Sequence, residues 1–258
     1  MQRSVVRVHL GPPSKSIMKP KISVIIAAYN EERLLPRCLT ALQKQTYPQE
    51  KFEIIVVNNG SKDETYAVAK QFGVQVYTYT EMQGCAASRV CGVAHAKGEL
   101  IAFTDADAAP EADWLEKVDA AFEDAQIVFV GGQAVPDENS SWTQFVYSAY
   151  HAFDAFQATI RKPLMGGYNM IVRKSAYDAI GGINKTLQAA DDWELSIRLL
   201  KKFGPRRIKF DPALRVTVST RKQNNKMIFV RYLKDHIQNY INLVLLGKTK
   251  TNSLENIR

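Results

Sequence analysis

The feature that most constrains this chain is an alternation of short apolar runs with helical patterns, beginning at Lys21. The apolar runs are typical of buried strands, and the segments between them place apolar residues at helical spacing. This β-α-β-α-β-α-β order predicts an α/β fold with a mostly parallel sheet covered by helices, and ligands at the carboxyl ends of the strands. We expect strands at Ile22–Ala28, Phe52–Val57, Val74–Tyr79 and Leu100–Thr104, and helices at Glu31–Gln45, Lys62–Phe72 and Ala86–Ala96.

The pattern is less regular after residue 110. We expect helices at Trp114–Phe122, Trp142–Ile160, Asp191–Phe203 and Met227–Leu246, and strands at Ile127–Gly131 and Asn169–Val172. The last of these helices has an apolar stripe with basic residues beside it. Such a stripe faces a protein core or lies in a membrane interface, and the sequence leaves both open.

The charge of the chain is concentrated at its C-terminal end. The net charge is +8, but residues 1–197 hold 19 basic and 23 acidic residues, whereas residues 198–258 hold 15 and 3. This asymmetry favours an anionic partner, either a lipid surface or a phosphorylated substrate, or it is simply a solvated basic face. Nucleic acid is not expected as a partner, because no zinc finger, RNA-binding strand or basic coiled-coil region accompanies the charge.

The compartment is inferred from cysteine content and hydropathy. The three cysteines form no paired framework and show no metal-ligand spacing, which favours a reducing compartment. The longest apolar runs fall short of the roughly 20 residues that a spanning helix needs. We therefore expect a cytoplasmic protein, with peripheral contact at the inner face of the membrane as an alternative.

Three polar clusters follow expected strands or open expected helices. Asn58–Thr65 comes directly after a strand, where it forms a strand-to-helix turn and places Asn58 toward the crevice. Asp105 and Asp107 follow the strand Leu100–Thr104 with one small residue between them, an arrangement that suits a hard divalent cation. Their close approach would otherwise cause repulsion.

The third cluster is Asp191-Asp192 at the start of a helix. Acidic residues in a first helical turn often do no more than interact with the helix dipole. Their functional alternative is general-base catalysis on an attacking hydroxyl. The preceding Gly166-Gly167 and Gly181-Gly182 pairs permit tight turns or close approach of a ligand.

Five segments resemble family 2 glycosyltransferases and occur in the order found in that family. They are KISVIIAAYNEE (21–32), VVNNGSKDET (56–65), CAASRVCGVAHAKGELIAFTDADA (85–108), GGYNMIVRKSAYDAIGGI (166–183) and DDWELSIRL (191–199). The likeness covers about residues 20–222. It implies a GT-A fold, a nucleotide-diphospho-sugar donor with UDP-sugars favoured, a Mn²⁺ or Mg²⁺ ion, and inversion at the anomeric carbon.

The resemblance also implies roles for individual residues. Donor-binding positions are Ala28, Tyr29, Glu31, Asn58, Arg89 and Asp105, with Tyr29 placed to pack on the base. Asp107 matches the direct metal ligand, with Asp105 beside it, and Asp192 matches the catalytic base. The chain departs from the family pattern at Asn58-Asn59, where two aspartates are usual, and at Asp191, where glutamate is usual. The tail segment Ser219–Lys222 only loosely resembles a phosphate-facing segment of some relatives.

Composition, periodicity and the resemblance together divide the chain into three parts and leave the acceptor open. We expect a disordered arm over residues 1–20, a GT-A domain over 21–222 with a donor-binding half (21–110) and an acceptor half (111–222), and a basic amphipathic helix and tail over 223–258. The acceptor is a hydroxyl on a lipid-linked molecule, a cell-surface glycan precursor or a soluble compound. The alternatives are a non-catalytic nucleotide-sugar or polyanion binder of the same fold and a nucleotidyltransferase, although the glycine-rich phosphate loop of the latter is missing after the first strand.

Overall fold

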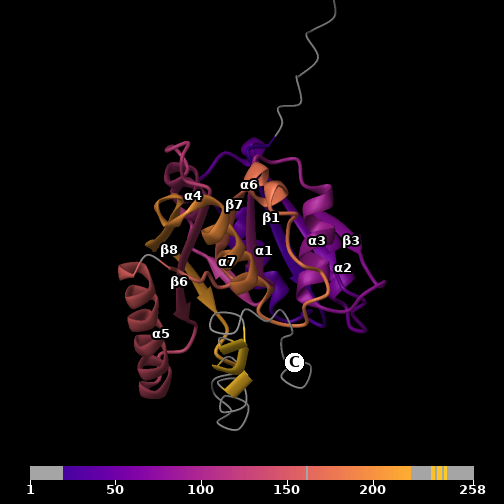
Figure 1. The fold of residues 1–258 in the computed structure, drawn as a ribbon. Coiled ribbons are helices and arrows are strands. Elements are labelled where there is room, and N and C mark those ends of the chain that lie inside the picture. The colour runs from indigo at the N-terminus through magenta and orange to yellow at the C-terminus, as the bar shows by residue number, and fades with distance from the viewer. Residues whose placement is uncertain (1–19, 161, 222–233, 236, 240, 243–258) are drawn as a thin grey trace, which may run out of the picture.

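The computed structural model of the chain describes residues 20–160, 162–221, 234–235, 237–239 and 241–242. The elements follow the order β1 (Ile22–Ala28), α1 (Leu35–Gln43), η1 (Gln49–Lys51), β2 (Phe52–Asn58), α2 (Thr65–Gln71), β3 (Gln75–Thr78), α3 (Cys85–His95), β4 (Leu100–Asp105), β5 (Ala108–Pro110), α4 (Trp114–Ala121), β6 (Phe129–Pro136), α5 (Ser141–Thr159), β7 (Met170–Arg173), α6 (Lys174–Ala179), α7 (Asp191–Phe203), η2 (Pro205–Arg207) and β8 (Ile208–Val218). Figure 1 shows α2 and β3 at one edge of the molecule and α5 at the opposite edge.

One sheet of eight strands, in the order β3-β2-β1-β4-β7-β6-β8-β5, organises the fold. Strand β1 runs parallel to both β2 and β4, and β2 runs parallel to β3. Strand β7 is antiparallel to β4 and β6, while β8 is parallel to β6 and antiparallel to β5. The predicted α/β class with a mostly parallel sheet flanked by helices is therefore confirmed.

Helices cover both faces of the central strands, which explains why those strands are apolar throughout. In β1, alternate side chains point to opposite faces, so that Val24 and Ile26 pack on one side and Ile25 packs on the other. The first face is covered by α1 and α4, through residues such as Leu35, Leu39, Leu42, Trp114 and Leu115. The second is covered by α3, α6 and α7, through residues such as Ala86, Val93, Ala176, Leu195 and Leu199.

The helix predicted from Glu31 starts later, with α1 at Leu35. Asn30 adopts a left-handed φ of 54°, and the backbone N–H of Glu31 donates to Thr65 Oγ1 at 2.7 Å. The chain after β1 is therefore bound to the start of α2 before it turns into a helix. Helical periodicity does not report this contact between distant segments. The contact shifts the start of α1 to Leu35.

The sequence does not predict strands β5 and β8, helix α6 or the short 3-10 helices η1 and η2. The strand expected at Ile127–Gly131 also begins later and extends to Pro136. Within it, a Cβ atom on Gly131 would lie 2.1 Å from Met165 Sδ, and one on Gly132 would lie 2.2 Å from the Leu214 carbonyl. Glycines are needed here because neighbouring segments approach the β6 backbone closely.

Two expected parts lie largely outside the described residues. These are the arm over residues 1–20 and the helix Met227–Leu246, of which residues 234–235 and 237–239 are described and helical. The domain boundaries stay predictions. No helix in the described part of the chain has both the length and the hydropathy to cross a membrane.

Candidate active site

The parallel register brings the predicted donor-binding residues to one edge of the sheet. Ala28 is paired with Asn58 on β2, and the preceding residue of β1, Ala27, is paired with Asp105 on β4. The ends of three neighbouring parallel strands thus supply Ala28, Asn58 and Asp105. This edge is where an α/β sheet of this kind binds its ligands.

Arg89 of α3 joins two acidic clusters that are far apart in sequence. Its Nη2 donates to Asp105 Oδ1 at 3.0 Å, and its Nη1 donates to Asp191 Oδ2 at 2.8 Å. Arg89 and Asp191 are buried, with side chains 4% and 7% exposed. Because an isolated buried charge is very costly, this three-residue bridge fixes the start of α7 against the end of β4. We call it the Arg89 bridge.

The backbone around the Arg89 bridge is shaped to fit it. A Cβ atom on Gly167 would lie 2.1 Å from Arg89 Nη2, so only glycine allows the chain to pass this close to the guanidinium. The Phe103 ring lies on another side, with its centroid 5.9 Å from Arg89 Cζ. Burial alone would lower the pKa of Arg89, but Cys85, Asp191 and Asp105 raise it well above its ordinary value.

Asp192, the predicted base, lies beside this bridge but is held differently. Its Oδ2 accepts from the Gly167 N–H at 2.8 Å, and its Oδ1 accepts from the Trp193 N–H at 2.8 Å. The side chain is only half-buried, whereas Asp191 is buried. Burial and the adjacent Asp191 raise the pKa of Asp192 to about 6, while Arg89 and the two N–H donors oppose the rise. A carboxyl group with this pKa is ionised at neutral pH and can still accept a proton.

Asp107, the predicted metal ligand, faces a second arginine. Arg221 Nη2 donates to Asp107 Oδ2 at 3.1 Å, and the same guanidinium forms a two-pronged ion pair with Glu31. The preceding residue, Thr220, holds this segment in place, because its backbone N–H and its hydroxyl both donate to Asp137 Oδ1. The Asp107 carboxylate thus lies where positive charge is accommodated, which fits a cation-binding role.

A divalent cation at this position would have few protein ligands. In the described part of the chain, no three acidic, histidine or cysteine side chains gather closely enough to hold a metal ion. Asp107 and Asp105 would supply carboxylate oxygens, and a diphosphate and water would supply the rest, a common arrangement for Mg²⁺.

The predicted nucleoside-binding residues lie at the ends of β1 and β2 and in the loop after β1, which is bound to the loop after β2. Asn30 Oδ1 accepts from the Lys62 N–H at 2.8 Å, which complements the Glu31 contact described above. Asn58 is buried, and its Oδ1 accepts from the Ser61 N–H at 3.1 Å. Tyr29 is half-buried at the end of β1. The structure thus places these residues together and gives Asn58 a turn-stabilising role as well.

Asn59, which the sequence analysis treated only as a departure from the family, organises the entry to α3. Its Oδ1 accepts from the Gly84 N–H at 2.8 Å, and its Nδ2 donates to the carbonyls of Tyr79 and Met82. The side chain is buried. Asn59 therefore supports the helix that carries Arg89, a role that an amide fulfils because it both donates and accepts.

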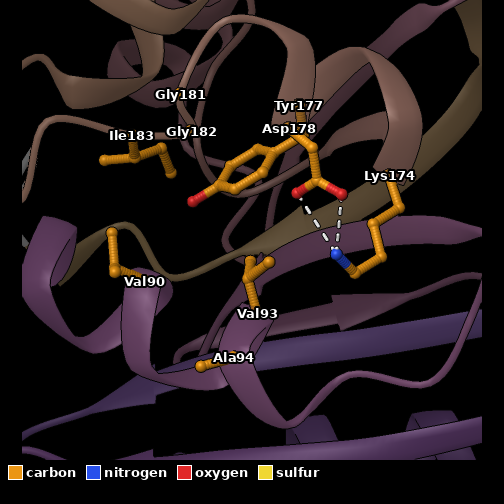
Figure 2. A pocket seen from close by; sticks show the side chains of 9 residues that line it. All are labelled: Val90, Val93, Ala94, Lys174, Tyr177, Asp178, Gly181, Gly182 and Ile183. Atoms are coloured by element: carbon orange, nitrogen blue, oxygen red, sulfur yellow. Dashed lines mark hydrogen bonds and ion pairs between the residues drawn. The ribbon is translucent and has the colours of Figure 1, made fainter.

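A separate pocket of about 360 Å³ lies between α3 and α6. It is lined mainly by Val90, Val93, Ala94, Tyr177 and Ile183, with the Lys174–Asp178 ion pair at 2.8 Å along one side. Figure 2 shows this pair at the rim and the Tyr177 ring directed into the space. None of the acidic residues of the Arg89 bridge lines it, so this pocket is distinct from the candidate active site.

The sequence matches a known family. The model for glycosyl transferase family 2 matches residues 23–181. Glycosyltransferase AglE of Haloferax volcanii is 30% identical over 179 residues, which is 67% of this chain and 59% of that protein. Glycosyltransferase RP339 of Rickettsia prowazekii is 25% identical, over 72% of this chain and 61% of that one. The chain therefore spans about 60% of the length of these relatives.

Solved structures share the fold at low sequence identity. The mannosyltransferase PcManGT of Pyrobaculum calidifontis, in complex with GDP-Man and Mn²⁺, has a TM-score of 0.72 at 21% identity, covering 91% of this chain and 66% of that one. TarS of S. aureus, in complex with UDP-GlcNAc, has a TM-score of 0.62 at 20% identity, covering 78% and 59%. These structures are GT-A glycosyltransferases, and they confirm that fold for this chain.

Proposed function

Because this chain belongs to glycosyl transferase family 2, we propose that it moves a sugar from a nucleotide-diphospho-sugar to an acceptor hydroxyl with inversion at the anomeric carbon. The observation that carries the proposal is the Arg89 bridge, which fastens Asp105 to Asp191. It brings together two acidic clusters whose remaining members, Asp107 and Asp192, have different partners. One cluster suits a cation-bound diphosphate and the other suits a proton acceptor.

The donor nucleoside would bind where the predicted residues meet at the sheet edge. Ala28, Tyr29, Glu31 and Asn58 belong to β1, β2 and the loops that follow them. The related structures contain GDP-Man in one case and UDP-GlcNAc in another. The resemblance to this family favours a UDP-sugar, and the amide of Asn58 would hydrogen-bond the base as either donor or acceptor.

The diphosphate would lie near Asp107, with a Mn²⁺ or Mg²⁺ ion held by Asp107 and Asp105. Such an ion acts as a Lewis acid and stabilises the negative charge of a leaving diphosphate by several kcal/mol. Arg221 must first release the Asp107 carboxylate, since its Nη2 bonds that oxygen here. We expect Arg89 to position Asp105 and Asp191, because both of its terminal nitrogens are already engaged by them.

Asp192 would act as the base. Its carboxylate takes the proton of the acceptor hydroxyl while that oxygen forms a bond to the anomeric carbon, and the carbon–oxygen bond to the diphosphate breaks with its electron pair. One displacement of this kind inverts the anomeric configuration. The Gly167 N–H orients the carboxylate, and the pKa of about 6 keeps it ionised at neutral pH.

A donor screen tests the proposal. Purified protein is incubated with Mn²⁺ and UDP-, GDP- or dTDP-sugars, and thermal stability is measured, because a ligand that binds the folded state raises the apparent melting temperature. The donor that stabilises the protein is then assayed for release of free nucleoside diphosphate with candidate lipid-linked and soluble acceptors. Release supports glycosyl transfer. Stabilisation without release by any acceptor favours the non-catalytic binder, and no stabilisation by any donor contradicts the proposal.

A further inference from the structure

Helix α5 presents a row of large apolar side chains to solvent. The exposed fraction is 37% for Trp142, 69% for Phe145, 39% for Phe153, 58% for Phe156 and 45% for Ile160 at the C-terminal cap. With the exposed Ala149 between them, these positions are spaced by three or four residues, so they lie on one face of the helix. We call this face the aromatic stripe.

The opposite side of α5, which packs on the sheet, is more polar than the aromatic stripe. Its buried residues include Thr143 and Gln157 beside Val146 and Tyr147, and His151 Nε2 lies 2.8 Å from the Ala134 carbonyl. A surface helix of a monomeric protein normally has the reverse arrangement, with its apolar face inward. Single exposed apolar residues need no explanation, but a contiguous row of them marks an interaction surface.

The helix that carries the aromatic stripe borders the candidate active site. Tyr147 and Val146 of α5 form a small apolar cluster against which Tyr168 packs. Tyr168 follows Gly167, whose N–H donates to Asp192. The side of the site that holds the proposed base is therefore next to the inner face of α5.

The charge of the C-terminal part of the sequence indicates an anionic partner. Between Asp211 and Asp235 the sequence contains six basic residues and no acidic one, and Arg161-Lys162 follows α5 directly. Figure 1 shows α5 and the described residues between 234 and 242, in yellow, projecting at the same end of the molecule. Ile237 in that segment is 53% exposed. Aromatic side chains beside basic ones are typical of a surface that binds anionic lipid.

We propose that the aromatic stripe of α5 docks on the surface of an anionic lipid bilayer. Trp142 and the three phenylalanines would enter the interfacial region, and the basic residues of the C-terminal part would attract the headgroups. The contact is peripheral. The inference goes beyond the proposed function and does not depend on it, because it rests on exposure and charge.

Vesicle binding tests this surface. The full chain is sedimented with vesicles of phosphatidylcholine containing phosphatidylglycerol, and with phosphatidylcholine alone. We expect wild-type protein to bind the anionic vesicles, and the Phe145→Ser/Phe156→Ser variant to bind them at least about tenfold more weakly, since two large apolar side chains are removed from the contact. Tyr66→Ser is the matched control, because Tyr66 is an aromatic residue of α2 that is 43% exposed.

Two further measurements complete the test. Thermal melting of the double variant shows whether it is folded, and quenching of Trp142 fluorescence by brominated lipid shows whether the stripe enters the bilayer in wild type. Quenching that Trp142→Phe removes supports the proposal. Absence of wild-type binding, equal binding by wild type and a folded double variant, or a wild-type dimer that the double variant dissociates would overturn it; the last result would assign the stripe to a second copy of the chain.

Discussion

The two acidic clusters of the site each contain two aspartates but differ in the groups that surround them. Asp105 ends strand β4 and Asp107 follows it, whereas Asp191 and Asp192 begin helix α7, and each cluster gives one carboxylate to Arg89. The remaining two differ. Asp107 bonds the cationic Arg221, but Asp192 is held by two backbone N–H groups. One buried arginine thus bonds one carboxylate of each cluster, while Arg221 pairs with Asp107, and burial beside Asp191 raises the pKa of Asp192 against the opposing effect of its N–H donors.

Replacing Asp192 is expected to give the largest effect on turnover. Asp192→Asn keeps the shape of the side chain and one of its two acceptor oxygens but cannot take a proton, so we expect the rate of sugar transfer to fall by about 10²–10⁴-fold. Release of nucleoside diphosphate measures the rate. Asp178→Asn, on the exposed face of α6, is the control and should leave it unchanged. A turnover within a few-fold of wild type would remove Asp192 from the mechanism.

Removing the shared arginine is expected to disrupt both clusters. Arg89→Met leaves Asp191 buried without its cation, a change that typically costs about 3–5 kcal/mol of unfolding free energy. Chemical denaturation measures the loss. Arg206→Met, an exposed arginine in η2, serves as the control. If the stability of Arg89→Met equals that of wild type, the Arg89 bridge is not what joins the two parts of the site.

The sequence predicted the first half of the molecule well because its strands are buried on both faces. β1, β2 and β4 read as continuous apolar runs, and the helices between them carry the matching stripes. β8 was not predicted, since Asp211-Pro212 interrupts its apolar pattern, and β5 has only three residues. β5 pairs with β8, and β8 pairs with both β5 and β6, and a local pattern does not report such pairing between distant segments.

Local sequence patterns also predicted only part of the candidate site. The resemblance predicted roles for Asp105, Asp107, Asp192 and Arg89, because each belongs to a short recognisable motif. It did not reveal the role of Arg221, which contacts Glu31 across 190 positions of the sequence. It also could not assign Asp191 to Arg89, because that pairing depends on how α3 and α7 pack across the sheet. Local motifs therefore do not predict ion pairs between side chains that are far apart in the sequence.

The raised pKa of Asp192 predicts a specific dependence on pH. Because folding raises this pKa from 3.8 to about 6, the folded protein binds the proton more tightly than the unfolded chain does. The group's stabilising contribution is therefore present below pH 4 and is lost as the pH rises through 6. We expect the stability of Asp192→Asn relative to wild type to increase between pH 4 and pH 7, by up to about 3 kcal/mol. Thermal melting at both pH values measures it; a constant difference would contradict the assignment.

The smallest expected effect is on the affinity for Mn²⁺, because Arg221 already forms an ion pair with Asp107. Arg221→Gln removes a partly exposed ion pair, so we expect Mn²⁺ alone to bind about twofold to fivefold more tightly. Calorimetry without nucleotide measures this affinity. Arg33→Gln, an exposed arginine in the loop after β1, is the charge-matched control. Weaker Mn²⁺ binding by Arg221→Gln would show that the arginine does not compete for this carboxylate.

The central claim is that one acidic cluster binds the donor's cation and the other accepts the proton. Calorimetry of donor binding in the presence of Mn²⁺, comparing Asp107→Asn with Asp192→Asn, tests it most directly. We expect Asp107→Asn to lose the Mn²⁺-dependent part of the affinity, because a carboxylate ligand is gone, and Asp192→Asn to bind the donor within about twofold of wild type. Undiminished binding by Asp107→Asn, or an equal loss in both variants, would contradict a site in which one acid holds the donor's cation and the other accepts the proton.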